Sequence, residues 1–304
     1  MTERLRIGFA GVGLMGHGVA RNILERGGHA LSVLGHRNRA PVEDLLRRGA
    51  REAADMAELA AEADLVFTCV PSSAEVEALV DGPRGLLAGL RPGTILIDCT
   101  TADPEATRRI GARVAAQGGA MIDAPLGRTP KEAEEGRLST YVGGDAQIIA
   151  RVRPVLETYA DTIVVCGGLG AGTTAKLINN SIAVGTCAVI AEALATASKL
   201  GVDMDALCDV LSAGGANGRM WQMMMPWVRA GDDSHLKGPL RIAAKDMRTY
   251  ARMAEGAGVA AFIAQAISQT YRLALNEGHG ERFMPVLPGI LADLNGAPIR
   301  TLEG

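Results

Sequence analysis

The sequence has few of the features that mark metal-binding, secreted or membrane proteins. Its five cysteines are scattered, odd in number and free of a Cys-x-x-Cys pair, so neither a disulfide framework nor a zinc site is expected. Its five histidines show no metal-ligand spacing, and no metal is required. The longest apolar run, 182–191, is too short to span a membrane, and no signal-peptide pattern precedes the first apolar segment. We therefore expect a cytoplasmic protein.

The chain also has little net charge, since acidic and basic residues nearly balance and the formal net charge is −3. Such a balance gives no broad positive field for nucleic acid or an anionic membrane, so any anion must be bound by local groups. The chain has 304 residues, of which 48% are hydrophobic, and is long enough to bury one large core or two ordinary ones. The composition predicts two domains and a small-molecule partner.

Short apolar segments alternate with amphipathic helical patterns through the first half of the chain. The apolar segments are predicted strands at residues 5–10, 30–34, 65–70, 94–98, 120–123, 139–142 and 162–165. Strands that alternate with helices are typical of a mostly parallel sheet with helices on both faces. Residues 1–168 are therefore predicted to form a doubly wound α/β domain of the Rossmann type.

Strand signals stop after the glycine-rich segment 167–172, and the rest of the chain has helical patterns. Residues 173–200 are predicted to form one uninterrupted helix of about 42 Å, long enough to leave one domain and become the spine of another. Further helices are predicted at 204–213, 242–256 and 260–276. We expect an all-α domain over residues 169–304, joined to the first domain by a long interdomain helix.

A glycine-rich loop joins the first predicted strand to the first predicted helix. It has the sequence Gly11-Val12-Gly13-Leu14-Met15-Gly16. In this context the first glycine permits the tight turn, the second lets a pyrophosphate approach the backbone, and the third lets the helix pack on the strand. Amides at the helix N-terminus would bind the phosphates. The loop therefore predicts a dinucleotide site made by these six residues.

The segment after the second predicted strand bears on the choice between NADP and NAD. An acidic residue about 20 positions after the loop usually holds the ribose of NAD, whereas an arginine accommodates the 2′-phosphate of NADP. Here that position is His36, followed by Arg37, Asn38 and Arg39, and the next carboxylate is Glu43. The segment favours NADP, with NAD as the alternative. A solvated turn whose arginines only face water would give the same pattern.

Four segments together resemble the β-hydroxyacid dehydrogenase family, which includes 3-hydroxyisobutyrate dehydrogenases, tartronate semialdehyde reductases and sulfolactaldehyde reductases. They are the glycine-rich loop with Ala20-Arg21-Asn22-Ile23, Asp123-Ala124-Pro125, Gly170-Ala171-Gly172 leading to Lys176-Leu177-Ile178-Asn179-Asn180, and Lys245-Asp246. The resemblance implies an enzyme that interconverts small aldehyde acids and hydroxy acids at a cleft between a Rossmann domain and a helical domain. It also implies that Val70, Pro71 and Thr101 border the cofactor.

The same resemblance assigns the catalytic role to Lys176, near the start of the long helix. Hydride addition to a carbonyl leaves an alkoxide, so the site needs a proton donor that also stabilises negative charge. Asn180 lies four residues on, on the same helical face, where its amide can orient the lysine or the substrate. By resemblance, Asn179 contacts the substrate, and Lys245 lies near the substrate or the nicotinamide.

The expected substrate loop departs from the common family pattern. Most members follow Asp-Ala-Pro with Val-Ser-Gly-Gly, whereas this chain has Gly127, Arg128 and Thr129 in place of the serine and the two glycines. Gly-Arg-Thr is similar to the segment of sulfolactaldehyde reductases, where the arginine recognises a sulfonate. A guanidinium suits an oxyanion, since its donors are planar and its charge is permanent. Arg128 could instead bind a carboxylate, or have no role in substrate binding.

These observations predict an NAD(P)-dependent oxidoreductase that transfers hydride between NAD(P)H and a small anionic aldehyde, or the matching 3-hydroxy acid. The substrate is a semialdehyde or sulfolactaldehyde, and the enzyme is expected to be a homodimer or homotetramer. The alternative from another class is a non-catalytic NADP-binding scaffold. The presence of Lys176 and the absence of a basic tail argue against that alternative.

Overall fold

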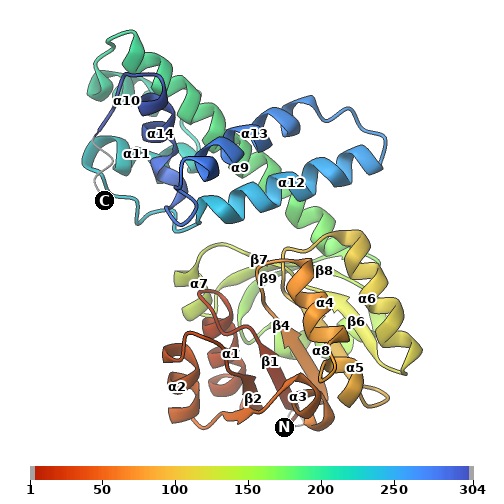
Figure 1. Cartoon of the computed structure of the whole chain (residues 1–304). Coiled ribbons are helices and arrows are strands. Elements are labelled where there is room, and N and C mark those ends of the chain that lie inside the picture. Colours follow the sequence, from red (N-terminus) through yellow and green to blue (C-terminus); the bar gives the residue numbers. More distant parts are fainter. Residues whose placement is uncertain (1–3, 301–304) are drawn as a thin grey trace. The chain divides into compact units, whose positions relative to one another are not determined.

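The computed structural model describes residues 4–300 and divides into two compact units, Met1–Lys176 and Leu177–Gly304. The first unit contains the strands, and the second is helical (Figure 1). The division falls inside the long helix α9 (Ala171–Lys199), which contributes its first turns to one unit and the remainder to the other.

In the described part of the chain, nine strands form a single sheet with the order β3-β2-β1-β4-β5-β6-β8-β7, and β9 pairs with β8. Neighbours from β3 to β6 run parallel, and antiparallel pairing occurs where β8 meets β6 and β7. This confirms the predicted doubly wound, mostly parallel fold. The strands are β1 (Arg6–Ala10), β2 (Ala30–Leu34), β3 (Arg51–Ala53), β4 (Leu65–Thr68), β5 (Ile95–Asp98), β6 (Ala120–Asp123), β7 (Leu126–Gly127), β8 (Leu138–Gly143) and β9 (Ala160–Gly167).

Two of these strands are not predicted by the sequence pattern. β3 has three residues and β7 has two, so neither contains the apolar run of four or more on which the prediction depends. Among the described residues, β3 is an edge strand whose one partner is β2. The predictions also extend too far at Leu5 and Val70, which lie just outside β1 and β4.

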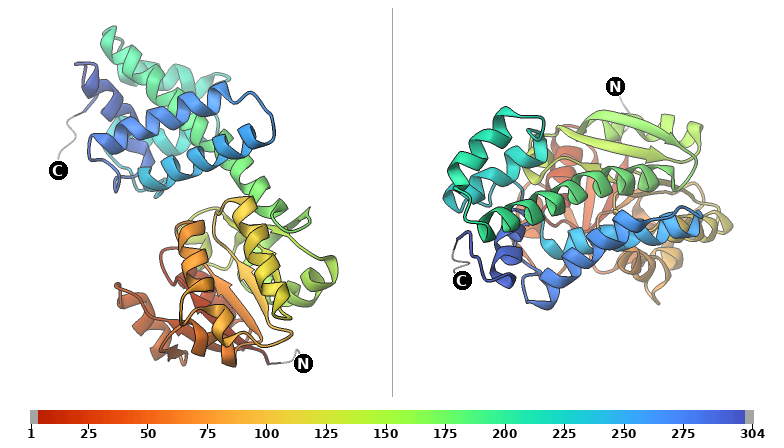
Figure 2. Two further views of the ribbon diagram at one scale, coloured as in Figure 1. Left: turned by 45° about the vertical axis from the view of Figure 1, so that its right-hand side comes forward. Right: turned by 90° about the horizontal axis from the view of Figure 1, so that it is seen from above.

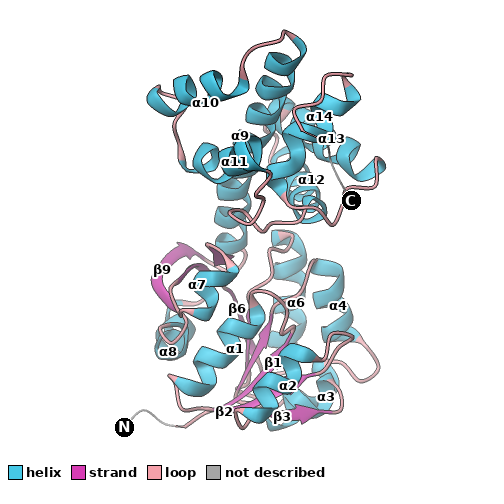
Figure 3. Cartoon of the chain, turned by 90° about the vertical axis from the view of Figure 1, so that its left-hand side faces the viewer, coloured by secondary structure: helices cyan, strands magenta, loops and turns pink. Residues whose placement is uncertain are grey.

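Helices cover both faces of the sheet (Figure 3). Several begin at an aspartate whose carboxylate accepts hydrogen bonds from first-turn amides, as Asp103 and Asp145 do. One face packs against α1 (Gly16–Glu25), α2 (Ala40–Arg47), α7 (Pro130–Glu134) and α8 (Ala146–Leu156). The other packs against α3 (Met56–Glu62), α4 (Ser73–Asp81), α5 (Leu86–Gly89) and α6 (Pro104–Ala116). The carboxyl edge of the sheet is left for the loops.

The second unit is a bundle of helices (Figure 2). These helices pack around an apolar core of their own. Trp221, Met224 and Trp227 of α11 (Arg219–Ala230) are buried, so the segment that carries both tryptophans packs in the interior of this unit. Helix α9, predicted at residues 173–200, begins two residues earlier than predicted, at Ala171, and ends one residue earlier, at Lys199. The other helices are α10 (Met204–Ala213), α11 (Arg219–Ala230), α12 (Leu240–Gly256), α13 (Phe262–Asn276), the 3-10 helix η1 (Met284–Val286) and α14 (Leu287–Leu294).

Helix α9 is long and apolar enough to cross a membrane when judged by length and composition alone. The core helix of a soluble protein passes the same test, and 44% of its most apolar window is buried inside the protein. The helix is therefore weak evidence for a membrane protein.

Candidate active site

The glycine-rich loop is closely packed at its first and last glycines and open at the middle one. Gly11 has φ +100°, and a Cβ there would overlap the Cys69 carbonyl oxygen at the end of β4. A Cβ at Gly16 would overlap the Gly11 carbonyl oxygen. A Cβ at Gly13 would meet nothing within 4 Å, so the backbone there faces open space. The arrangement holds the loop against the sheet and leaves room for a ligand beside Gly13.

The N-terminus of α1 follows directly and suits an anionic group. Met15 occupies the N-cap position, and its side chain makes no capping hydrogen bond. First-turn amides of a helix have no partner within the helix, and a phosphate satisfies them well. Within the loop, the Val12 side chain is buried and the Leu14 side chain is 65% exposed. The residues of this loop therefore fit the pyrophosphate of a dinucleotide.

A pocket of about 560 Å³ lies at the end of β2. In the sheet, β2 is the neighbour of β1, the strand that leads into the glycine-rich loop. His36 and Arg39 line it, and Arg37 and Asn38 lie exposed in the same turn. The Arg39 guanidinium donates two hydrogen bonds to the Glu52 carboxylate, at 2.6 and 2.8 Å. Glu52 comes from β3, one of the two strands that the sequence pattern does not predict, so its place in this pocket has no sequence signal.

The ends of β4 and β5 are joined by a buried polar cluster. The Val70 amide donates to Thr100 Oγ1 at 3.2 Å, while the buried Asp98 carboxylate accepts from Thr68 Oγ1 at 2.9 Å and from the Thr100 amide at 3.0 Å. Burial raises the pKa of Asp98 to about 6. The expected cofactor residues Pro71 and Thr101 lie on the loops that this cluster holds, one exposed and one half-buried. Sequence reasoning missed Asp98 and Thr100 as positioning residues.

Asp123, at the end of β6, fastens the start of α9 to the sheet. Its buried carboxylate accepts hydrogen bonds from the Gly170 amide at 2.7 Å and the Thr173 amide at 2.6 Å. Burial raises the pKa of Asp123. A Cβ at Gly172 would overlap the Tyr141 carbonyl oxygen, so the helix also approaches β8 very closely. These contacts fix the turn that carries Lys176.

Lys176 is half-buried and its Nζ lies 6.0 Å from the centroid of the Tyr141 ring, a cation–π distance. The same ring lies beside Gly127, where a Cβ would approach Tyr141 Cε2 to 3.2 Å and would overlap Ser139 Oγ. Tyr141 therefore stands between the expected substrate loop and the expected catalytic lysine. Its sequence signal is only that of an alternating strand position.

The two other residues of the expected substrate loop are engaged by protein groups. Arg128 has φ +74°, and its guanidinium donates to Asp161 Oδ2 at 2.8 Å, to Thr162 Oγ1 at 3.2 Å and to the Arg137 carbonyl oxygen. Its side chain is 31% exposed. Thr129 is the N-cap residue of α7, and its amide and hydroxyl both donate to the Glu132 carboxylate. A substrate anion at Arg128 must therefore compete with Asp161 for the guanidinium.

In the second unit, Asn180 and Lys245 meet at a buried carboxylate. Asn180 Nδ2 donates to Asp246 Oδ2 at 2.7 Å, and Lys245 Nζ lies 2.8 Å from Asp246 Oδ1. Asp246 is 4% exposed. Asn179 is exposed and donates from Nδ2 to Asn180 Oδ1 at 3.2 Å. Asp246 thus orients two of the expected site residues, and its signal in the sequence is its place beside Lys245.

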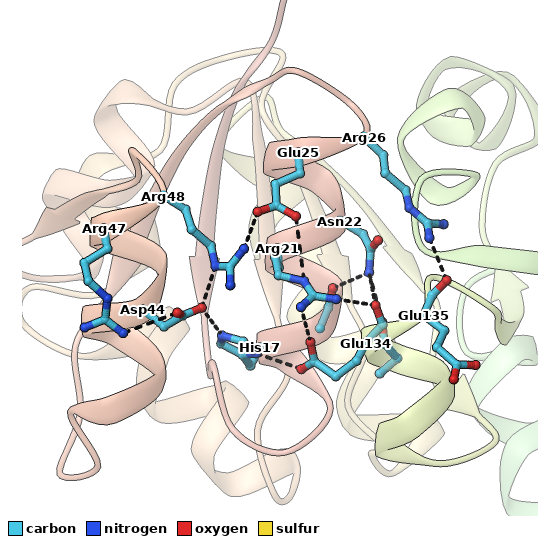
Figure 4. Close-up of polar contacts among 12 residues, drawn as sticks. His17, Arg21, Asn22, Glu25, Arg26, Asp44, Arg47, Arg48, Glu134 and Glu135 are labelled. Atoms are coloured by element: carbon cyan, nitrogen blue, oxygen red, sulfur yellow. Dashed lines mark hydrogen bonds and ion pairs between the residues drawn. The ribbon is translucent and has the colours of Figure 1, made fainter.

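A network of charged side chains joins the helices α1, α2 and α7 (Figure 4). The ring nitrogens of His17, in the first turn of α1, lie 2.7 Å from Glu134 Oε1 on α7 and 3.0 Å from Asp44 Oδ2 on α2. A hydrogen bond from Arg48 lowers the pKa of Asp44 to about 2. The network ties together the helices that follow the glycine-rich loop, the β2 turn and the substrate loop.

Among residues 4–300, no group of three or more His, Cys, Asp or Glu side chains is placed to hold a metal.

Two protein-family models match consecutive parts of the chain. The model for the NAD-binding domain of 6-phosphogluconate dehydrogenase matches residues 6–168. The model for the NAD-binding part of NADP-dependent 3-hydroxyisobutyrate dehydrogenase matches residues 170–284.

Individual relatives match over nearly the whole of both chains. NAD-dependent L-serine dehydrogenase of Pseudomonas aeruginosa is 30% identical over 297 residues, covering 96% of this chain and 99% of the relative. 3-Sulfolactaldehyde reductase of Escherichia coli K12 is 30% identical over 276 residues, covering 91% and 92%. The crystal structure of a 3-hydroxyisobutyrate dehydrogenase from Salmonella typhimurium superposes with a TM-score of 0.82 at 27% identity, covering 94% of this chain and 99% of that one.

Proposed function

Since the chain belongs to the β-hydroxyacid dehydrogenase family of NAD(P)-dependent oxidoreductases acting on CH–OH donors, we propose that it interconverts a small anionic aldehyde and the matching 3-hydroxy acid. The observation that carries this proposal is the placement of Lys176. Asp123 fastens the helix that bears it, and the Tyr141 ring lies between it and the substrate loop.

When bound, a nicotinamide cofactor would supply the hydride in the reduction and accept it in the oxidation. Lys176 donates a proton to the carbonyl oxygen during reduction and stabilises the negative charge that develops there. Asn180, oriented by Asp246, holds the lysine or the substrate by its amide, and Asn179 and Lys245 contribute further donors to the substrate. In the oxidative direction the same lysine accepts the proton.

We propose NADP as the preferred cofactor, with NAD as a second cofactor. Arg37 and Asn38 lie exposed in the turn after β2, where an arginine suits a 2′-phosphate. The family model for the second half of the chain is that of an NADP-dependent enzyme, whereas the relative from Pseudomonas aeruginosa is named as NAD-dependent. The two comparisons therefore support both cofactors.

The substrate's anionic group is proposed to bind at Arg128. Its guanidinium offers forked donors to a carboxylate or a sulfonate, and the chain shares Gly127, Arg128 and Thr129 with the pattern of sulfolactaldehyde reductases. The contact with Asp161 holds the guanidinium in place, and a substrate anion would have to share or displace it. The lead substrate is a three-carbon aldehyde that bears an anionic group, with a carboxylate and a sulfonate as the two candidates for that group.

The test is a panel of succinate, methylmalonate and tartronate semialdehydes together with sulfolactaldehyde, each followed at 340 nm with NADPH and with NADH. We expect turnover of at least one, fastest with NADPH. Failure of all four would overturn the substrate class. Dinucleotide binding without turnover of any of them would favour the non-catalytic scaffold.

The proposal includes a cytoplasmic homodimer or homotetramer. Apolar side chains lie exposed on α9 and α13, where they would be covered by a second copy of the chain. They are Ile178, Ile182, Val189, Phe262 and Ile263.

A further inference from the structure

A carboxylate from β3 reaches the pocket at the end of β2. Glu52 and Arg39 both line this pocket, and their side chains form a two-fold hydrogen-bonded ion pair within it. The pair lies directly over Gly35, because a Cβ at that position would overlap Glu52 Oε1 and Arg39 Nη1. The missing side chain at residue 35 therefore makes room for a carboxylate from the neighbouring strand.

Arg37 and Arg39, the two arginines of the turn after β2, differ in whether a carboxylate pairs with them. Arg39 is neutralised by Glu52, and the Arg39 hydrogen bonds lower the pKa of the Glu52 carboxyl. In the described part of the chain, Arg37 makes no ion pair and lies exposed. The pocket holds the carboxylates of Glu52 and Glu58, of which Glu58 pairs with Arg51 at 3.1 Å, and Arg37 lies exposed in the turn beside it. A guanidinium and a carboxylate are the groups that recognise a 2′-phosphate and a ribose hydroxyl respectively.

We propose that Glu52 is the residue that determines the relative affinity for NADPH and NADH. This inference rests on the proposed dinucleotide site. Glu52 performs from β3 the role that an acidic residue at the end of β2 usually performs, accepting hydrogen bonds from the ribose hydroxyls of NADH. The same carboxylate repels the 2′-phosphate of NADPH, while Arg39 limits that repulsion by neutralising it.

The test compares the dissociation constants of NADPH and NADH, measured by nucleotide fluorescence without substrate, in the wild type and three variants. Glu52→Gln removes the repulsion and frees Arg39, so the preference for NADPH should rise by about tenfold. Arg39→Gln leaves Glu52 uncompensated, and the preference for NADPH should fall by about tenfold. Both variants lose the ion pair, so a role in local structure alone would move both ratios in one direction.

Glu62→Gln is the matched control, because Glu62 pairs with Arg51 and does not line the pocket. It removes one negative charge from the same unit and should leave the ratio within twofold of the wild type. Equal shifts in Glu62→Gln and Glu52→Gln, or shifts of the same sign in the Glu52 and Arg39 variants, would overturn the inference. Binding of both nucleotides with an unchanged ratio would refute only the role of Glu52, whereas binding of neither would refute the proposed function as well.

Discussion

Lys176 is the residue on which the proposed chemistry depends. Lys176→Ala removes the proton donor and the cation at the developing alkoxide, so turnover should fall by about a thousandfold. Dinucleotide binding should remain nearly intact, since the glycine-rich loop does not involve this side chain. Steady-state turnover and nucleotide fluorescence measure the two effects.

Lys199→Ala provides the control, since Lys199 lies on the same helix and its Nζ donates to the Asn295 carbonyl oxygen at 2.7 Å. Its turnover should match the wild type. If Lys176→Ala kept more than about a tenth of wild-type turnover, the lysine would not be the proton donor.

Asp98 should make stability depend on pH. Burial raises the pKa of this carboxyl from 3.8 to about 6, so the folded state binds its proton more tightly than the unfolded state does. The free energy of unfolding should therefore fall as pH rises from about 4 to about 6, by up to about 3 kcal/mol from this residue. Asp98→Asn removes the titration, and urea denaturation of both proteins at pH 4.5 and 7.5 measures the difference.

Asp98→Asn also lowers the free energy of unfolding by an amount that does not change with pH. Its amide places a donor at the Oδ2 position, which has no hydrogen-bond partner among the described residues. The test therefore compares how the stability of each protein changes between the two pH values. Wild type should lose stability relative to the variant on going to pH 7.5. Parallel pH curves would contradict the buried, titrating carboxyl.

Sequence reasoning succeeds for residues whose role is set by neighbours in the chain. The glycines at 11, 13 and 16 act through local backbone geometry, and in the structure Gly11 and Gly16 are closely packed while Gly13 faces open space; their role in binding a dinucleotide stays a prediction. Glu52 and Tyr141 could not be predicted, because they reach their positions through strand pairing with distant segments. The roles assigned to Arg128, Asn180 and Lys245 stay predictions, and the structure adds Asp161 and Asp246 as their partners.

At the scale of elements, Asp123 joins a strand end to the first turn of α9. Asp123→Ala would leave two buried amides without their acceptor, so the free energy of unfolding should fall by about 2–3 kcal/mol. Because Lys176 lies one turn further on, turnover should also fall, by about tenfold to a hundredfold. Asp123→Asn keeps an acceptor oxygen and should recover much of both.

Asp145→Ala is the matched control for this helix cap. Asp145 caps α8 through the amides of Gln147 at 2.8 Å and Ile148 at 3.1 Å, and α8 itself carries none of the predicted site residues. Its loss should cost about 1 kcal/mol of stability and no turnover. Equal losses of turnover in the alanine variants of Asp123 and Asp145 would show that stability, and not the placement of Lys176, controls the rate.

The elements themselves are predicted best where they are long and regular. The parallel strands and helix α9 follow from apolar runs and helical periodicity, and their ends differ from prediction by one or two residues. β3 and β7 are too short to produce such a pattern and are held by pairing with one neighbour each. The pocket at the end of β2 depends on β3, so its composition could not follow from the sequence alone.

At the scale of the whole molecule, exposed apolar side chains predict self-association. Ile178, Ile182 and Val189 lie on one face of α9, and the last two are 68% and 65% exposed. An isologous contact through such a face would remove it from water, which favours a dimer. We expect sedimentation of the wild type as a dimer or tetramer, with a melting temperature that rises with protein concentration.

Ile182→Glu places a charge in the middle of this face, and burying it against a second copy would leave it unpaired. The variant should sediment as a smaller species, and its melting temperature should no longer depend on concentration. Val210→Glu makes the same change at a side chain that is 66% exposed on α10, and it should leave the assembly intact. Dissociation by Val210→Glu but not by Ile182→Glu would place the interface on another face, and a wild type that sediments as a monomer at all concentrations would refute the assembly altogether.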